Sequence, residues 1–144
     1  MHKLLFEMQL KPSSNLLYGN LRLVYPNGNA INYMATSGCA GWQQPGDEWV
    51  RGKGPIPAGE YSIPTEPYWL ETRGVEGDFF HITPDPVVSV HGIRAELGIH
   101  FDANVPGTAG CIGLVREFGW RRLCDRLASI ADSGVKSLPL TVKY

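Results

Sequence analysis

The chain of 144 residues has few cysteines, no long apolar run and no excess of charge of either sign. Its three cysteines, Cys39, Cys111 and Cys124, are widely spaced and form no C-x-x-C pair, which argues against a disulfide framework and a structural zinc site. No stretch reaches the roughly 18 apolar residues of a membrane-spanning helix. The formal net charge of -1 provides no basic surface for nucleic acid. We expect one domain over residues 1–144, with reduced thiols and no cofactor, metal, nucleic-acid partner or membrane span.

The N-terminal segment also lacks the pattern of a secretory signal. Its apolar run, residues 4–6, stops at Glu7, whereas the apolar region of a signal peptide spans about 7–15 residues. The sequence therefore predicts synthesis in the cytoplasm without a signal peptide.

Glycine (17 residues) and proline (11 residues) are abundant and scattered, which indicates many turns between short strands. Apolar residues alternate with a period of two near residues 4–10, 21–25, 31–33, 61–63, 80–82, 88–90 and 140–144. Asn27-Gly28 predicts a tight hairpin turn between two of these strands. Helical spacing occurs over residues 117–132, where one apolar stripe contains Trp120, Leu123, Leu127, Ile130 and Ala131, with Cys124 beside it in the core. We predict a mainly β domain, a β-sandwich or a partly open barrel, with one α-helix in the C-terminal half.

Two segments fit the pattern T-x-G-C-x-G: "TSGCAG" from Thr36 and "TAGCIG" from Thr108. A cysteine between glycines is a nucleophile, a metal ligand or a small buried side chain. A free thiol is only a few per cent thiolate at neutral pH, so a nucleophilic cysteine needs a nearby imidazole. Cys39 has no histidine close to it in sequence, and residues 41–46 suit contact with a ligand. Cys111 follows a segment rich in histidine, which makes it the better nucleophile.

That segment, residues 81–111, contains His81, His91 and His100, together with Arg94 and Asp102. Strand alternation over residues 98–102 places His100 and Asp102 on one face and the apolar Ile99 and Phe101 on the other. A polar face of this kind is ordinary where it meets water. Both His91 and His100 precede Cys111 closely enough to fold back across a loop. Gly110 allows a sharp turn that aims consecutive N–H groups at a developing oxyanion.

The stretch "GIHFDANVPGTAGCIGL" resembles the signature of L,D-transpeptidase catalytic domains, in which a strand ending in Ile-His is followed by a loop and Ser/Thr-x-Gly-Cys-Ile. The stretch "GKGPIPAGEYSI" is similar to an earlier segment of the same family. The resemblance covers about residues 52–114 and is greatest to short-loop relatives among phage and secreted antibacterial proteins. It implies a mostly β sandwich whose cysteine attacks a carbonyl of a peptidoglycan stem peptide and forms a thioester.

Carried to this chain, the resemblance makes Cys111 the nucleophile and His100 the motif histidine, with N–H groups around Gly110 and Cys111 as the oxyanion hole. The residues that we expect at the substrate are His91, Arg94, Asp102 and Thr108. Asp102 either orients His100 or holds the loop, and we favour the loop. The chain departs from the family at Ala109, where histidine is frequent, and at Gly113, where arginine is frequent. Because residue 113 is glycine, Arg94 is the alternative cation for binding a substrate carboxylate.

The predicted function is therefore acyl transfer on peptidoglycan stem peptides, for cross-linking or exchange, by a cysteine enzyme of L,D-transpeptidase type. A cysteine peptidoglycan hydrolase, either a phage lysis enzyme or an antibacterial effector, is the main alternative. A zinc hydrolase using His81, His91, His100 and Asp102, and a non-catalytic wall-binding or virion module, are the others. Without a signal peptide, such a protein acts on the wall after release or injection. An immunity protein or a virion component stays open as a partner.

Overall fold

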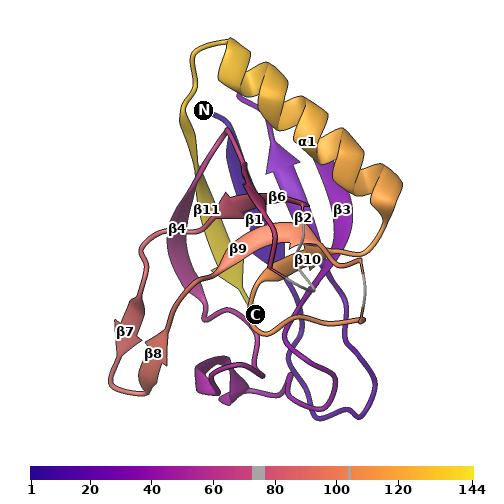
Figure 1. Cartoon of the computed structure of the whole chain (residues 1–144), viewed down its shortest axis with the longest axis vertical. Coiled ribbons are helices and arrows are strands. Elements are labelled where there is room, and N and C mark those ends of the chain that lie inside the picture. Colours follow the sequence, from indigo (N-terminus) through magenta and orange to yellow (C-terminus); the bar gives the residue numbers. More distant parts are fainter. Residues whose placement is uncertain (73–76, 104) are drawn as a thin grey trace.

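The computed structural model describes residues 1–72, 77–103 and 105–144. In these residues the main sheet has nine strands in the order β4-β11-β1-β2-β3-β10-β9-β6-β5, and a separate hairpin pairs β7 with β8 (Figure 1). The strands are β1 (Lys3–Glu7), β2 (Gly19–Val24), β3 (Ala30–Ser37), β4 (Gly59–Pro64), β5 (Tyr68–Leu70), β6 (Gly77–His81), β7 (Val87–Ser89), β8 (Gly92–Arg94), β9 (Gly98–Phe101), β10 (Ile112–Leu114) and β11 (Ser137–Lys143). The helices are the short 3-10 helix η1 (Asp47–Trp49) and α1 (Glu117–Asp132).

The sheet curls until its two halves approach each other, which confirms the partly open barrel and not two separate sheets. Ser62 of β4 and Thr83, just after β6, form a bridge in which each N–H donates to the other's carbonyl oxygen at 2.9 Å. This bridge joins β4, at one end of the strand order, to the segment that follows β6. The inner face of the curl carries the apolar residues that the alternation predicts, such as Leu4, Phe6 and Leu21, which are at most 1% exposed.

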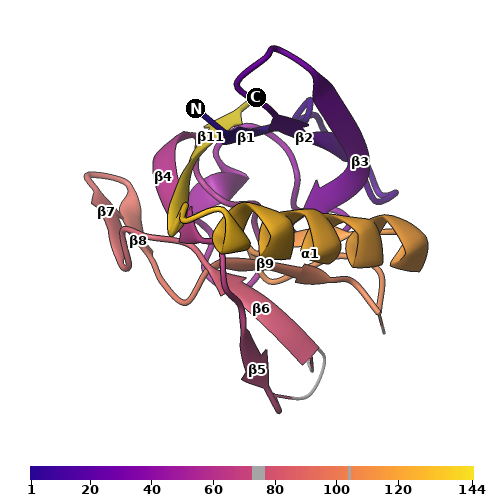
Figure 2. The ribbon, with the colours of Figure 1, turned by 90° about the horizontal axis from the view of Figure 1, so that it is seen from above.

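The helix α1 has the bounds that the apolar spacing predicts, residues 117–132. Trp120, Leu123, Leu127 and Ile130 are its buried residues, and the Trp120 ring meets the Phe80 ring edge-on at 5.9 Å between centroids. Figure 2 shows α1 lying across the opening of the curl, with β1, β2 and β3 on one side and β6 and β9 on the other. Neither helix of the described residues is long and apolar enough to cross a membrane.

The turn at Asn27-Gly28 forms as predicted, between β2 and β3. Gly28 has a φ of 89°, and the N–H of Tyr25 donates to the carbonyl oxygen of Asn29 at 2.8 Å. Two strand pairs in the sheet are parallel, β1 with β11 and β9 with β10. The second of these pairs brings the segment around His100 beside the segment that follows Cys111.

Candidate active site

The two T-x-G-C-x-G segments lie against each other where β3 ends and β10 begins. The Thr108 N–H donates to the Gly38 carbonyl oxygen at 2.9 Å, and the Gly38 N–H donates to Thr108 Oγ1 at 3.0 Å. Ser37 Oγ donates to the Gly110 carbonyl oxygen at 3.1 Å, and Cys39 Sγ donates to the Thr108 carbonyl oxygen at 3.2 Å. The first segment therefore holds the loop that leads to Cys111, and the Cys39 thiol is part of that support.

Cys111 lies directly before β10 and is half-buried. Its thiol points to the carbonyl oxygen of Glu96, with 3.8 Å between sulfur and oxygen. Burial raises the pKa of Cys111 to about 11, although a hydrogen bond from the Gly98 N–H and the charge of Arg94 both act to lower it. At neutral pH the resting thiol is therefore protonated, and a base is needed to ionise it.

His100, in the middle of β9, has the geometry of such a base. Its Nδ1 lies 2.9 Å from the carbonyl oxygen of Phe101. A carbonyl oxygen only accepts, so Nδ1 carries the proton and Nε2 keeps its lone pair. Nε2 is buried and has no hydrogen-bond partner in the described residues. Burial lowers the pKa of His100, so the imidazole is neutral at pH 7.

The face of β9 that carries His100 is shielded from water at this residue, the arrangement that is costly for an unpaired polar side chain. His100 is 3% exposed, because the Phe79 ring of β6 stacks on the imidazole at 6.1 Å between centroids and 14° between planes. Gly98 makes room for this ring, since a Cβ there would lie 2.1 Å from Phe79 Cζ. Both faces of β9 are therefore buried. Sequence periodicity alone does not reveal that Phe79 covers the face that carries His100.

The strand register places His100 beside the strand that begins directly after Cys111. His100 is the direct partner of Gly113 in the parallel pair β9–β10, and Cys111 precedes Gly113 by two residues. No hydrogen bond joins the two side chains in this conformation, because the thiol points to Glu96. Catalytic hydrogen bonds often form only once substrate is bound.

Arg94 is 2% exposed and does not meet solvent. Its guanidinium donates to the carbonyl oxygens of Glu48, Gly54, Pro55 and Ala109, the last at 2.9 Å. In the described part of the chain no carboxylate pairs with it. Arg94 therefore fastens the Cys111 loop to the segment of η1 and places an uncompensated positive charge beside the thiol. Because Nη1 and Nη2 of Arg94 already donate to four backbone carbonyl oxygens, they are not available to bind a substrate carboxylate.

The role of Gly110 differs from the one that sequence predicts. Its N–H donates to Thr108 Oγ1 at 3.2 Å, so in this conformation it is not directed at a substrate oxygen. Gly110 has a φ of 137°, and a Cβ at this position would lie 2.2 Å from Arg94 Nη2. Glycine is thus required for the close approach of Arg94 to the loop.

The structure shows the contacts of three further residues named in the sequence analysis, Asp102, Thr108 and His91. Asp102 Oδ2 accepts the N–H of Gly107 at 2.8 Å, so Asp102 holds the loop, as favoured above; Asn104 of that loop lies outside the described residues. Thr108 is buried, and besides accepting from Gly38 and Gly110 its hydroxyl donates to the Cys111 carbonyl oxygen at 2.6 Å. The Thr108 hydroxyl group therefore joins the first motif, at Gly38, to the loop that leads to Cys111. His91 lies in the turn between β7 and β8, with its ring 6.1 Å from that of Trp49.

A pocket of about 200 Å³ opens at Cys111. It is lined by Arg51, Gly52, Arg94, Ala95, Glu96, Leu97, Ala109 and Cys111. The sequence analysis missed Arg51 and Glu96. Glu96 has a positive φ of 58°, rare outside glycine, and its N–H donates to Asp85 Oδ1 at 3.2 Å. This strained residue aims its carbonyl at the thiol, and no sequence signal marks it, because the positive φ falls on a residue that is not glycine or asparagine.

The histidines and Asp102 do not form a zinc site. His81 pairs with Asp85 at 3.2 Å, His91 lies beside Trp49, and His100 bonds to a backbone carbonyl. Over residues 1–72, 77–103 and 105–144, no three histidine, cysteine, aspartate or glutamate side chains are grouped as metal ligands.

Comparison with known protein families, curated proteins and solved structures found no match to this chain.

Proposed function

We propose that the protein is a cysteine acyltransferase of L,D-transpeptidase type that acts on peptidoglycan stem peptides. The observation that carries the proposal is the buried Nε2 of His100, which has no hydrogen-bond partner in the described residues and belongs to β9, the parallel neighbour of the strand that begins directly after Cys111. A buried polar atom without a partner costs free energy, of the order of 1–3 kcal/mol. Such a cost is typical of a group kept ready to take a proton.

In the proposed reaction, Nε2 of His100 removes the thiol proton as Cys111 Sγ attacks the carbonyl carbon of the donor peptide. The oxyanion that forms collapses, the C–N bond breaks, and the leaving amine takes the proton from His100. The product is a thioester on Cys111. An acceptor amine then attacks the thioester carbon and gives a proton to His100; the C–S bond breaks, and the departing sulfur takes this proton from Nε2, which restores the thiol and the neutral imidazole. Water in place of the amine gives hydrolysis.

Two cations lie near the reacting sulfur, and they have different roles in the proposal. The buried charge of Arg94 stabilises negative charge on sulfur, but its donors are occupied by backbone carbonyls. Arg51 is exposed at the rim of the pocket and is free to approach a substrate. We therefore assign to Arg51 the binding of a substrate carboxylate, the role for which the chain has no arginine at residue 113.

The proposal is tested by incubating the protein with purified peptidoglycan and identifying the muropeptides by mass spectrometry. New 3–3 cross-linked dimers identify transfer, and shortened stem peptides without new cross-links identify hydrolysis. Cys111→Ala should abolish both products while folding is retained. Cys39→Ala, at the matched cysteine of the first motif, should keep most of the activity. The proposal is contradicted if the wild-type protein leaves the muropeptide composition unchanged, or if Cys111→Ala keeps full activity.

The same proposal places the site of action at the cell wall, reached after release or injection from the cytoplasm. A non-catalytic wall-binding module is the competing interpretation. Its expected result is retention on peptidoglycan with no change in muropeptide composition.

A further inference from the structure

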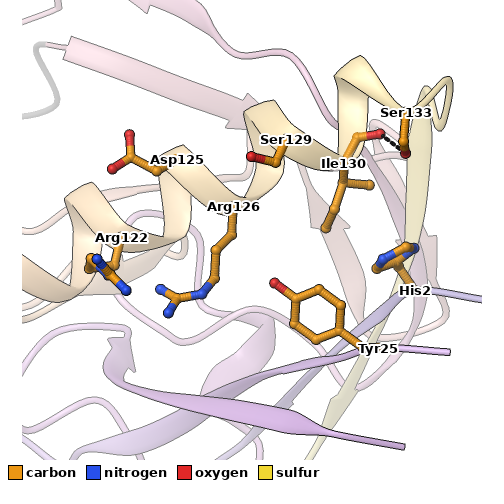
Figure 3. A pocket seen from close by; sticks show the side chains of 8 residues that line it. All are labelled: His2, Tyr25, Arg122, Asp125, Arg126, Ser129, Ile130 and Ser133. Carbon is orange, nitrogen blue, oxygen red and sulfur yellow. Dashed lines mark hydrogen bonds between the residues drawn. The ribbon is translucent and has the colours of Figure 1, made fainter. Parts of the chain in front are cut away.

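A second hollow lies between α1 and the β2–β3 hairpin, formed by residues that take no part in the site at Cys111 (Figure 3). Its volume is about 490 Å³, within the range of about 300–1,000 Å³ that is usual for small-molecule sites. The residues around it are His2, Tyr25, Arg122, Asp125, Arg126, Ser129, Ile130 and Ser133, and we call it the helix groove.

The helical wall of the groove carries two arginines one turn apart. Arg122 and Arg126 are an i, i+4 pair of like charge, which destabilises a helix by a few tenths of a kcal/mol. Figure 3 shows both side chains extending from α1 one turn apart, and the Asp125 carboxylate, which also lines the groove, projecting from a different part of the helix surface. Neither arginine forms an ion pair within the described residues. Arg121, by contrast, pairs with Glu117 at 2.6 Å outside the groove.

The remaining contacts of the two arginines are weak. Arg126 Nη1 donates to Tyr33 Oη at 3.3 Å, and the Arg122 guanidinium lies 5.9 Å from the centre of the exposed Phe118 ring. Most of the N–H donors of the two guanidinium groups are therefore available to a ligand. Two guanidinium groups one helical turn apart at the edge of a hollow suit a carboxylate, which accepts paired N–H bonds.

The facing wall is aromatic and apolar. The Tyr25 ring is held edge-on by His2 at 5.2 Å between centroids, and Ile130, 4% exposed, forms part of the floor. Ser129 adds a hydroxyl group, while Ser133 is already committed to the Ile130 carbonyl oxygen at 2.6 Å. A ligand that fits this lining has one apolar face for Tyr25, hydroxyl or amide groups for the polar rim, and an anionic substituent for the arginines.

From this lining we infer that the helix groove binds a sugar unit that carries a carboxylate. The ring lies on Tyr25, and the carboxylate lies between Arg122 and Arg126. The hollow is concave and suits one or two sugar rings, whereas an acidic protein partner would need a far larger surface than the groove offers. The site does not use Cys111, so the inference can be tested independently of the proposed reaction.

The test is an NMR titration of the full chain with N-acetylmuramic acid, which has a carboxylate, and N-acetylglucosamine, which has the same ring without one. Saturable shifts of groove amides are expected with the first sugar, with affinity that falls as salt is raised. Arg122→Gln/Arg126→Gln should weaken binding at least about tenfold, since each charge-assisted hydrogen bond is strong. Arg121→Gln, the matched control on the same helix, should bind like the wild type, and so should Cys111→Ala.

Three results overturn the inference. Equal binding of the two sugars removes the role of the carboxylate. Equal shifts with acetate alone identify an adventitious ion only. Unchanged affinity in a folded Arg122→Gln/Arg126→Gln variant, with its helix content checked by circular dichroism, places the ligand elsewhere.

Discussion

Nδ1 of His100 lies 2.9 Å from the carbonyl oxygen of Phe101, and this contact decides which ring nitrogen is available as a base. The proton stays on Nδ1, and the buried Nε2 keeps its lone pair. A backbone carbonyl thus does the orienting that an acidic side chain performs in many catalytic sites. The nearest candidate for such a side chain, Asp102, is instead bonded to the Gly107 N–H.

His100→Ala should lower the rate of the proposed wall-directed acyl transfer by about 10²–10⁴-fold, since it removes the proposed general base. His91→Ala is the control, because His91 lies beside Trp49 in the β7–β8 turn and should retain most of the rate. Rates are measured as the release of muropeptide products. A loss in His91→Ala with normal activity in His100→Ala would reverse the assignment of the base.

Alkylation of Cys111 by iodoacetamide should be slower than that of free cysteine at pH 7 and should rise about tenfold per pH unit up to about pH 10. The reason is that burial raises the pKa of the thiol to about 11, so the reactive thiolate is scarce below that pH. The measurement uses Cys39→Ala/Cys124→Ala, in which Cys111 is the single thiol. A plateau near pH 7 would instead identify a thiolate–imidazolium pair at rest.

Gly110→Ala should destabilise the fold by about 3 kcal/mol or more, because it adds a positive-φ penalty to a clash with Arg94. Gly28→Ala provides the comparison, since Gly28 also has a positive φ but no atom within 4 Å of the added Cβ. Its cost should be about 1 kcal/mol, from backbone conformation alone. Urea unfolding measures the stability of both variants. Equal losses of stability would mean that the clash with Arg94 adds no cost at residue 110.

Thr108→Val should destabilise by about 2–4 kcal/mol, because it removes the acceptor for the N–H groups of Gly38 and Gly110 and the donor to the Cys111 carbonyl. Thr108→Ser keeps the hydroxyl and should lose less than about 1 kcal/mol. The two variants are compared by thermal unfolding. If Val is tolerated as well as Ser, the hydroxyl does not hold the two motifs together.

Sequence periodicity predicted the local elements well where one face is buried. The bounds of α1 and the Asn27-Gly28 turn follow directly from apolar spacing and from the φ that glycine permits. The last strand was predicted near residues 140–144 and occupies Ser137–Lys143, because pairing with β1 and β4 sets its length. The parallel pairs β1–β11 and β9–β10 could not be predicted, since nothing local in either strand identifies its partner.

In the candidate site, too, local features could be predicted, whereas contacts between distant segments could not. The strand that carries His100 pairs with the strand that follows Cys111, whereas the prediction that His100 acts on Cys111 stays a prediction. The burial of Arg94 could not be predicted, because its four acceptors are backbone carbonyls from distant segments and leave no complementary side chain in the sequence. The contact between the two T-x-G-C-x-G segments was likewise missed, although their shared pattern was evident.

The pairing of β1 with β11 also bears on the order in which the molecule folds. Leu4 and Leu140 are direct partners in the interior of the sheet, so the strand order β4-β11-β1-β2 is complete only after nearly the whole described chain has been synthesised. Contacts of such long sequence separation slow folding, because the loop entropy is lost before the contacts form. In pulse-labelling hydrogen exchange, the amides of β1 and β11 should gain protection in one step, later than those of the local β2–β3 hairpin.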